Sequence, residues 1–423
     1  MKEHFATIIT IGDELLIGQV IDTNSAWLAQ KLNHIGFWVK QRWSIGDDAS
    51  AIVSALDAAL ASSSMVIITG GLGPTNDDIT KKVLTGYFDG QLQFNEAVLE
   101  HVTALLSKVK VSPLLERNRQ QAMLPSTAKV LWNAVGTAPG MLFEKNGKLV
   151  FSLPGVPHEM KYVMENSGIG IIQEHYSLPS IQHKTLLTAG IGESTLAEHI
   201  QDWENQLPAN IKLAYLPNNG MVRLRITGID KQSHTLSVQL QEQFEKLKVL
   251  VSEWLITDED KTLNLVLGEL LNDTSCTVGS VESCTGGYLA HLITSLSGSS
   301  KSYLGSIVSY ANDVKENLVH VKHETIEQFG AVSEETIKEM VKGGLEQLGV
   351  NYVIATSGIM GPLGGSEAKP VGTVWLGVGT KEKIETKLIK ARWDRLKNIE
   401  FTAQQALLFL IKFIKANPKA NDC

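Results

Sequence analysis

Apolar runs alternate with amphipathic stretches through the first 165 residues of the chain. Phe5–Ile11 and Met65–Thr69 consist almost entirely of apolar and β-branched residues, which predicts strands buried on both faces. Residues 23–35 and 49–61 carry apolar side chains at helical spacing, which predicts two helices. Because strands alternate with helices, the pattern predicts a parallel sheet covered on both faces. Residues 167–179 are expected to lead out of this unit.

A different pattern follows this first unit. Residues 183–189 and 221–227 alternate between polar and apolar positions, as half-buried strands do. Residues 193–203 and 234–247 have the spacing of amphipathic helices. Together these segments predict a small α+β module, and the acidic residues 257–261 after it are expected to form a linker or a helix cap.

The last part of the chain returns to alternating strands and helices. Four apolar segments predict strands, at residues 277–281, 301–309, 352–356 and 372–378, and residues 398–414 predict a closing helix. The expected fold class is therefore α/β, with two separate α/β domains joined by the small α+β module. The expected domain boundaries are 1–170, 171–256 and 257–423.

Composition narrows the range of partners. The 423 residues carry a net charge of −7, with 43% hydrophobic and 20% charged residues and no run of lysine or arginine. This balance argues against direct binding to nucleic acid or to an anionic membrane. The N-terminal residues do not resemble a signal peptide, and no stretch of about 18 apolar residues occurs, so we expect a cytoplasmic protein.

Glycine-containing turns follow the first buried strands. The strand that ends at Thr69 continues into "GGLGPTNDDITKKVL". In an open α/β sheet, ligands bind beyond the carboxyl ends of the strands. Backbone N–H groups of Gly70, Gly71 and Gly73 are therefore candidates for binding a phosphate, although no G-K-[ST] follows as in a P-loop.

Acidic residues near this turn are candidates for holding a divalent cation. Asp77 and Asp78 follow the glycines, and Asp47 is expected beyond a neighbouring strand. A carboxylate beside a phosphate repels it unless a cation lies between them. The alternative for Asp77 and Asp78 is helix capping. Asp13 and Glu14 stay open, since Asp13 also suits a cap.

A second candidate site lies in "SVESCTGG", residues 280–287. A strand before it and a helix after it place Ser283 at a strand-to-helix turn. There its hydroxyl is exposed near the free N–H groups of the helix start, which can stabilise an oxyanion. The alternative is that Ser283 or Thr285 is only an N-cap. Cys284 is a second contender as nucleophile, although a buried cysteine is usually inert.

The segments "GDELLIGQVIDTN", "TGGLGPTNDDIT", "NAVGTAPGM" and "LPGVPHEM" resemble the N-terminal domain of the CinA (competence/damage-inducible) family, which is related to the molybdopterin-binding fold. The resemblance implies hydrolysis of ADP-ribose to AMP and ribose 5-phosphate with magnesium, manganese or cobalt. It assigns the metal to Asp47 and Asp78, with Asp77 beside them. Asn133 and Glu159 would complete the pocket, the alternative being turn chemistry.

The segments "ESCTGG", "YLGSIVSYANDVKENLV", "GAVSEETIKEM" and "TSGIMGPLGGSEAKPVGTVW" resemble the CinA C-terminal domain, a nicotinamide mononucleotide deamidase. That reaction converts a carboxamide to a carboxylate and ammonia without a cofactor. Ser283 is the expected nucleophile, and Lys315 and Tyr310 are the candidate bases. A lysine serves as a base only if burial or a nearby cation lowers its pKa. Glu282 is a weaker candidate, because it should face the opposite side of the strand.

Substrate binding in this domain is expected from the two glycine-rich turns and one arginine. The candidates are Thr285, Gly286, Gly287, Ser357, Gly358, Gly361, Gly364, Gly365 and Arg395. The family usually shows T-G-I-A-G-P-D-G-G here, whereas this chain has Ser357, Met360 and Leu363 in place of Thr, Ala and Asp. These departures affect substrate fit more than the chemistry at Ser283.

The sequence thus predicts a bifunctional hydrolase of pyridine nucleotide salvage that acts on small nucleotides and forms a homodimer. One alternative is a protein that binds a pterin or nucleotide without turnover. Another, suggested by the family's name, is a partner protein in DNA uptake.

Overall fold

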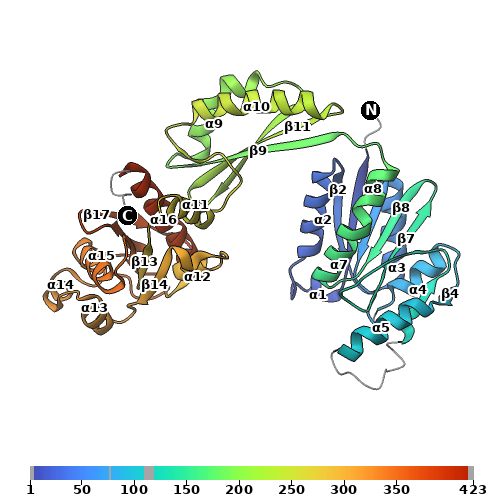
Figure 1. The fold of residues 1–423 in the computed structure, drawn as a ribbon, viewed down its shortest axis with the longest axis horizontal. Helices are drawn as coiled ribbons and strands as arrows, with labels where there is room; N and C mark the ends of the chain where they lie inside the picture. Colours follow the sequence, from blue (N-terminus) through green and yellow to red (C-terminus); the bar gives the residue numbers. More distant parts are fainter. Residues whose placement is uncertain (1–3, 76–77, 109–118, 418–423) are drawn as a thin grey trace. The chain divides into compact units, whose positions relative to one another are not determined.

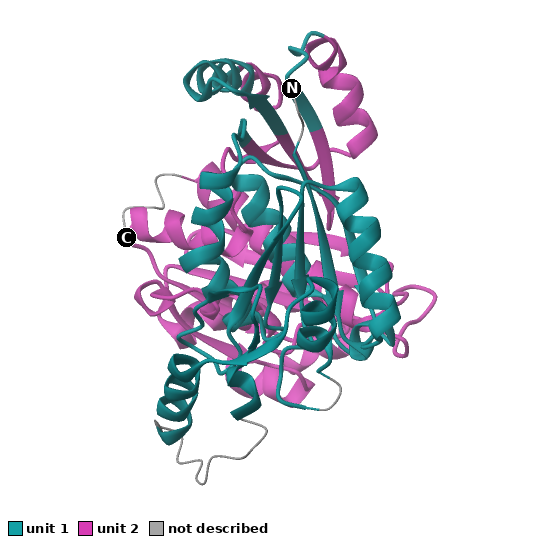
Figure 2. Ribbon diagram, turned by 90° about the vertical axis from the view of Figure 1, so that its right-hand side faces the viewer, with its two compact units in different colours: residues 1–183, 206–213, 226–245 teal, residues 184–205, 214–225, 246–423 magenta. Residues whose placement is uncertain are grey.

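The computed structural model describes residues 4–75, 78–108 and 119–417 of the chain. They form two compact units, which Figure 2 shows in different colours. The first comprises residues 1–183, 206–213 and 226–245, and the second comprises residues 184–205, 214–225 and 246–423. The structure contains α/β domains at both ends of the chain (Figure 1), as the sequence predicted. None of the described helices has the length and apolar character needed to span a membrane.

The N-terminal domain is built on a six-stranded sheet with the order β2-β1-β3-β8-β7-β6. Its strands are β1 (Phe5–Ile11), β2 (Trp38–Ile45), β3 (Met65–Thr69), β6 (Lys129–Leu131), β7 (Gly140–Lys145) and β8 (Lys148–Leu153). β1 pairs in parallel with β2 and with β3, and β3 pairs in parallel with β8, whereas the β8–β7 and β7–β6 pairs are antiparallel. The sheet is therefore mixed, and only its β2-β1-β3-β8 part is the parallel sheet that the sequence pattern predicted.

Helices cover both faces of this sheet (Figure 1). They are α1 (Asp13–Leu16), α2 (Thr23–His34), α3 (Ala49–Ser62), α4 (Thr80–Tyr87), α5 (Glu96–Lys108), α7 (Pro157–Val163) and α8 (Ile169–His175), with a short pairing of β4 (Leu92–Phe94) and β5 (Met123–Pro125). A hydrophobic core lies on each face of the sheet, and successive residues of β1 point into opposite cores. Ile8 packs with α2, α7 and α8, whereas Ile9 packs with α3, α4 and α5. The segment 167–179, expected to be a junction, contains α8, whose Ile172 is buried in the first of these cores.

The middle of the chain forms a four-stranded sheet with the order β10-β11-β9-β12. Its elements are β9 (Ser180–Ala189), α9 (Glu193–Asn205), β10 (Ile211–Asn218), β11 (Met221–Asp230), α10 (Ser233–Leu250) and β12 (Leu255–Thr257). These bounds extend the four segments predicted from the sequence by a few residues at one or both ends, because strand and helix ends carry little periodic signal.

The C-terminal domain has a five-stranded sheet with the order β14-β13-β15-β16-β17. Its strands are β13 (Val278–Glu282), β14 (Tyr303–Val308), β15 (Tyr352–Gly358), β16 (Thr373–Gly379) and β17 (Ile384–Lys390). β13 pairs in parallel with β14 and with β15, whereas β16 and β17 are antiparallel. The carboxyl ends of β14, β13 and β15 therefore meet at one edge of the sheet.

Two groups of helices cover the two faces of this sheet. α11 (Leu263–Asp273), α12 (Tyr288–Thr294) and α16 (Arg395–Ala416) share one core with Val278 and Ile354. α13 (Asn312–Val319), α14 (His323–Phe329) and α15 (Glu334–Leu348) lie on the other face, where Val281 and Val353 are buried. Val319, the last residue of α13, lies against Gly343 of α15. The two helices are so close there that a Cβ atom on Gly343 would come within 1.8 Å of the Val319 carbonyl oxygen.

We predict opposite effects for alanine at two helical glycines of this domain. Gly343→Ala should destabilise by about 1–3 kcal/mol, because its methyl group collides with the backbone of α13. Gly268→Ala is the matched control: its Cβ would lie 3.7 Å from Leu296 Cδ1, an ordinary contact. It should stabilise by about 0.5–1 kcal/mol through helix propensity. Chemical unfolding of both variants measures the two shifts, and an unchanged midpoint for Gly343→Ala would contradict the close packing.

Candidate functional site

The turn after β13 has a backbone that only glycines adopt without strain. The Ser283 N–H donates to the Thr356 carbonyl of neighbouring β15 over 2.9 Å, which anchors the turn to the sheet. Gly286 and Gly287 follow with φ angles of +60° and +96°. Two consecutive residues in this region favour glycine strongly. Backbone conformation is therefore sufficient to explain the glycine pair in "SCTGG".

The N–H groups at the start of α12 are not free, so that expectation from the sequence was wrong. Gly287, Leu289 and Ala290 donate their N–H groups to the Glu282 carboxyl group over 3.1, 3.0 and 2.8 Å. Among the described residues, the N–H groups of Cys284 and Thr285 make no hydrogen bond to another residue. These two amides, next to Ser283, are therefore the candidate donors for an oxyanion.

Ser283 is 8% exposed, and within the described part of the chain its hydroxyl makes no hydrogen bond. It follows Glu282, which pairs with Val308 at the end of β14. Ser309 continues that strand and donates its N–H to the Glu282 carbonyl over 2.8 Å. The hydroxyl of Ser283 is thus held at the carboxyl end of two neighbouring strands without a structural partner of its own, unlike a capping serine.

Lys315 of α13 is buried, with 2% of its surface exposed. Its Nζ donates to the carbonyl oxygens of Ser309 and Tyr310 over 2.9 and 3.2 Å. Burial lowers the pKa of Lys315, and its charge interacts with the Cys284 side chain, next to Ser283. The amine is therefore close to the turn and biased toward the neutral form that can accept a proton.

Cys284 is a poor nucleophile. Its side chain is 5% exposed, and burial raises the pKa of the thiol to about 12. Because the thiolate is the reactive form of cysteine, Cys284 stays unreactive at neutral pH. Of the two neighbours, the geometry favours Ser283.

A cavity of about 230 Å³ opens beside this turn. Cys284, Tyr310, Met360 and Arg395 are among its lining residues. Arg395, the first residue of α16, donates to the Tyr310 hydroxyl over 2.7 Å and to the Gly361 carbonyl over 2.9 Å. A guanidinium group has five N–H donors, so Arg395 can also bind an anion there.

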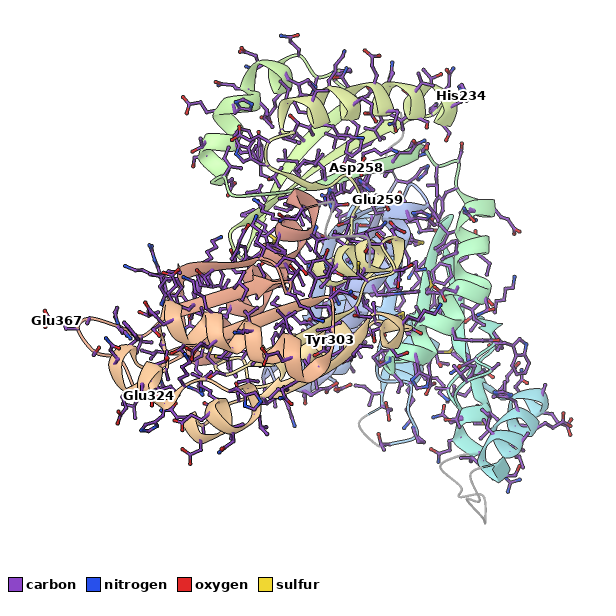
Figure 3. The ribbon with its side chains drawn as sticks, turned by 60° about the vertical axis from the view of Figure 1, so that its left-hand side comes forward. His234, Asp258, Glu259, Tyr303, Glu324 and Glu367 are labelled. Atoms are coloured by element: carbon purple, nitrogen blue, oxygen red, sulfur yellow. The ribbon has the colours of Figure 1, made fainter. Side chains whose placement is uncertain are left out.

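The glycine-rich segment after β15 forms the opposite wall of this cavity. Gly358 and Gly364 line it, with Met360 3% and Leu363 86% exposed. Ser357 is 1% exposed, and its hydroxyl donates to the Ala331 carbonyl over 2.7 Å, so it holds the domain together rather than facing the cavity. Figure 3 shows Glu367 at the outer tip of the same loop.

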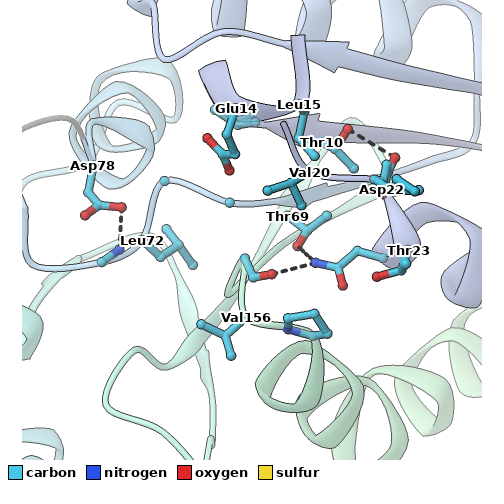
Figure 4. A pocket seen from close by; sticks show the side chains of 18 residues that line it. Thr10, Glu14, Leu15, Val20, Asp22, Thr23, Thr69, Leu72, Asp78 and Val156 are labelled. Atoms are coloured by element: carbon cyan, nitrogen blue, oxygen red, sulfur yellow. Dashed lines mark hydrogen bonds between the residues drawn. The ribbon is translucent and has the colours of Figure 1, made fainter. Parts of the chain in front are cut away.

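Another cavity, of about 400 Å³, lies beyond the carboxyl ends of β1 and β3 in the N-terminal domain (Figure 4). Gly70, Gly71 and Gly73 all line it. However, the Gly70 N–H donates to Leu153 over 3.1 Å and the Gly73 N–H donates to Asp78 over 2.7 Å. The expectation that all three present free N–H groups was therefore wrong for these two.

Of the candidate metal ligands that the structure describes, Asp78 lines this cavity and Asp47 does not. Asp78 accepts hydrogen bonds from Gly73 N, Thr75 N and the Thr75 hydroxyl. Asp47 lies at the end of the neighbouring strand, where it accepts from the Asp13 N–H over 3.2 Å. Asp77 lies outside the described residues. Among the residues that are described, no three His, Cys, Asp or Glu side chains gather as a metal site.

Asn133 does not line the cavity. Its amide nitrogen donates to Ala138 O and to the Glu159 carboxyl over 2.8 and 2.6 Å, and its oxygen accepts from Val135 N. Burial raises the pKa of Glu159. Asn133 and Glu159 were expected to complete the pocket, but neither lines this cavity; instead, the Asn133 amide donates to the Glu159 carboxyl group in the first turn of α7.

Several polar residues that line the N-terminal cavity were not among the residues predicted from the sequence. Asp22 caps α2 through the Ser25 N–H, and Asn24 donates to Thr69 and to Gly155. The Asn24 amide oxygen is buried without a hydrogen-bond partner. A signal was present in "DTNS", because an aspartate directly before a helical pattern is typical of an N-cap.

Three family models match successive parts of the chain. Residues 7–174 match a probable molybdopterin binding domain, residues 183–255 a damage-inducible protein CinA KH domain and residues 260–414 a CinA C-terminal domain. A CinA-like protein of Flavobacterium psychrophilum is 44% identical over 97% of this chain and 99% of its own length. One from Cytophaga hutchinsonii is 43% identical over 97% and 98%. The crystal structure of the competence/damage inducible protein CihA from Agrobacterium tumefaciens is 34% identical over 36% of this chain and 92% of that chain, with a TM-score of 0.35.

We predict that Cys284 resists alkylation in the folded protein. With its pKa at about 12, almost no thiolate exists at pH 8, and the side chain is also buried. Iodoacetamide should therefore leave the Cys284 peptide unmodified in mass spectrometry until the protein is denatured. Rapid labelling of the native protein at pH 8 would contradict this and return Cys284 as a nucleophile.

Proposed function

Because the chain belongs to the CinA-like family, with its CinA C-terminal domain, CinA KH domain and molybdopterin-binding-like domain, we propose that it is a bifunctional hydrolase. The C-terminal domain would convert nicotinamide mononucleotide and water to nicotinate mononucleotide and ammonia. The N-terminal domain would hydrolyse ADP-ribose to AMP and ribose 5-phosphate. The first activity has the stronger support from the geometry.

The observation that carries this proposal is the buried Lys315 amine beside the Ser283 turn. In the proposed reaction, Lys315 accepts the Ser283 proton while the hydroxyl oxygen attacks the carboxamide carbon. The Cys284 and Thr285 N–H groups stabilise the oxyanion that forms. The protonated amine then donates this proton to the amide nitrogen, so the C–N bond breaks, ammonia leaves and the acyl group remains as an ester on Ser283. Water attacks this ester while Lys315 accepts a proton from it. Lys315 returns this proton to the Ser283 oxygen as the C–O bond breaks, which releases the carboxylate and the serine.

Substrate phosphate has a candidate partner in Arg395. The guanidinium group lies in the cavity that Cys284 also lines, so a nucleotide could reach from the arginine toward the turn. Gly358 and Gly364 line the same cavity and allow a ligand to approach the backbone. Met360 fills part of this wall, whereas Leu363 points largely into solvent, so we expect Met360 to affect substrate fit more.

The second activity is supported by the position and content of the N-terminal cavity. Its volume of about 400 Å³ suits a small molecule, and it lies where α/β sheets bind ligands. Magnesium is usually held by one or two carboxylates together with substrate phosphates. Glu14 and Asp78, which line the cavity, fit such a cation, and Asp47 lies close to Gly71. When bound, the cation would neutralise the diphosphate and activate water.

Two other functions remain as alternatives with defined tests. A protein that only binds a pterin or nucleotide would retain the ligand without releasing AMP from ADP-ribose, whichever of the three metals is supplied. A partner in DNA uptake would retain DNA in a salt-dependent manner, which the net charge of −7 disfavours. We also propose that the protein is a cytoplasmic homodimer, as predicted in the sequence analysis.

Variants of the two sites should separate the two activities. Ser283→Ala is expected to reduce ammonia release from nicotinamide mononucleotide at least about 10³-fold, because it removes the nucleophile. It should leave ADP-ribose hydrolysis intact. Asp78→Asn should do the reverse, and each variant serves as the control for the other. Full deamidase activity in Ser283→Ala would show that Ser283 is only part of the turn.

The pH dependence of deamidation should report the Lys315 amine. Burial lowers its pKa from the ordinary 10.5, and only the neutral amine accepts a proton. We therefore expect kcat/KM to rise with pH along a limb whose midpoint lies below 10.5. Lys315→Met should lose about 10²–10⁴-fold in kcat at the pH optimum. A variant that keeps both the activity and the limb would exclude Lys315 as the base.

A further inference from the structure

The carboxyl group of Glu282 accepts several hydrogen bonds close to the C-terminal site. It is the last residue of β13, and it is 0% exposed. One oxygen accepts from the Thr285 hydroxyl and from the N–H groups of Gly287 and Leu289, over 2.7, 3.1 and 3.0 Å. The other accepts from the Ala290 N–H over 2.8 Å. A buried carboxyl group with this many donors is held in one orientation.

Further hydroxyl groups hold Glu282 from the side of the sheet. Ser280 and Ser306 donate to the second oxygen over 3.4 Å each, which makes these contacts weaker than the amide contacts. Ser280 also shares a hydrogen bond of 2.6 Å with the hydroxyl of Tyr303 on β14, a residue that Figure 3 labels. The carboxyl group therefore connects the central strands to the start of α12.

The donors of Glu282 lie on both sides of the glycine pair. Thr285 precedes the pair, and its hydroxyl also shares a hydrogen bond of 2.8 Å with Thr356 of β15. Leu289 and Ala290 belong to the first turn of α12. Glu282 thus fixes both ends of a turn whose two glycines would otherwise leave it free to move.

We propose that Glu282 is a positioning residue for deamidation. By binding the first N–H groups of α12, it closes the turn around Ser283 and leaves the Cys284 and Thr285 N–H groups as the two oxyanion donors. It touches neither the substrate nor the reacting atoms. The hydroxyl of Ser283 and the two amides keep their mutual geometry only while this carboxyl group is in place.

Hydrogen exchange tests the structural half of this proposal without reference to activity. Glu282→Gln keeps the size of the side chain but replaces one acceptor oxygen with an NH₂ group, which cannot accept from an amide. Exchange at residues 287–290 should become faster by about tenfold or more, since a lost hydrogen bond changes the opening equilibrium by roughly that factor. Unchanged exchange would overturn the proposal.

Glu339→Gln is the matched control. Glu339 holds the start of α14 in the same way, accepting from the Lys322 N–H and the Thr325 hydroxyl over 2.8 and 2.9 Å. This variant should speed exchange at Lys322, the N-cap of α14, and leave residues 287–290 unchanged. If Glu282→Gln does not fold, Thr285→Val provides the second variant, because it removes one donor to Glu282 and leaves the carboxyl group in place.

Kinetics test the positioning half, which rests on the proposed function. Glu282→Gln should lower kcat for nicotinamide mononucleotide by about ten- to a hundredfold, while KM changes little, because Arg395 and the glycine-rich wall are untouched. Glu339→Gln should keep both constants. Faster exchange with an unchanged kcat would overturn the positioning role. If the wild-type protein releases no ammonia, the proposed function fails, and the exchange experiment still decides whether Glu282 holds the turn.

Discussion

The C-terminal site depends on one buried carboxyl group and the amides it binds. Glu282 accepts the N–H groups of Gly287, Leu289 and Ala290, donors that every helix start must satisfy. In most helices a side chain at the cap itself fills this role, which would have made Ser283 or Thr285 a structural residue. Because the Glu282 carboxyl group, at the end of β13, accepts these N–H groups, the Ser283 hydroxyl is not needed to cap the helix.

Sheet topology explains why the other groups meet at this place. The parallel strands β14, β13 and β15 end at the same edge, so the turn after β13 lies between the segments that follow its neighbours. One neighbour leads to Tyr310 and to the buried Lys315, and the other leads to the glycine-rich wall. The N-terminal cavity follows the same rule at the ends of β1 and β3.

The sequence predicted the helices and strands that have a clear apolar run or a clear hydrophobic periodicity. The buried strands β1 and β3 agree with the predicted segments to the residue, because strands covered on both faces are almost wholly apolar. The strands β2 and β17 were missed, since their half-exposed residues lack such runs. The buried strand β8 was overlooked although its residues are largely apolar. Glu282 was underrated for a different reason: strand alternation gives the face of a side chain but cannot show which amides that face meets. The Gly70 and Gly73 N–H groups were wrongly expected to be free on the same ground.

Direct detection of the ester tests the central claim that the Ser283 hydroxyl attacks the carboxamide. The wild-type protein would be mixed with nicotinamide mononucleotide, quenched in acid within the first turnover and digested for mass spectrometry. We expect one added nicotinate mononucleotide acyl group on the peptide containing Ser283, with fragment ions that place it on the serine. Two results would contradict the claim. One is an acyl group on Cys284, and the other is release of one equivalent of ammonia in the first turnover with no adduct on any residue of this turn.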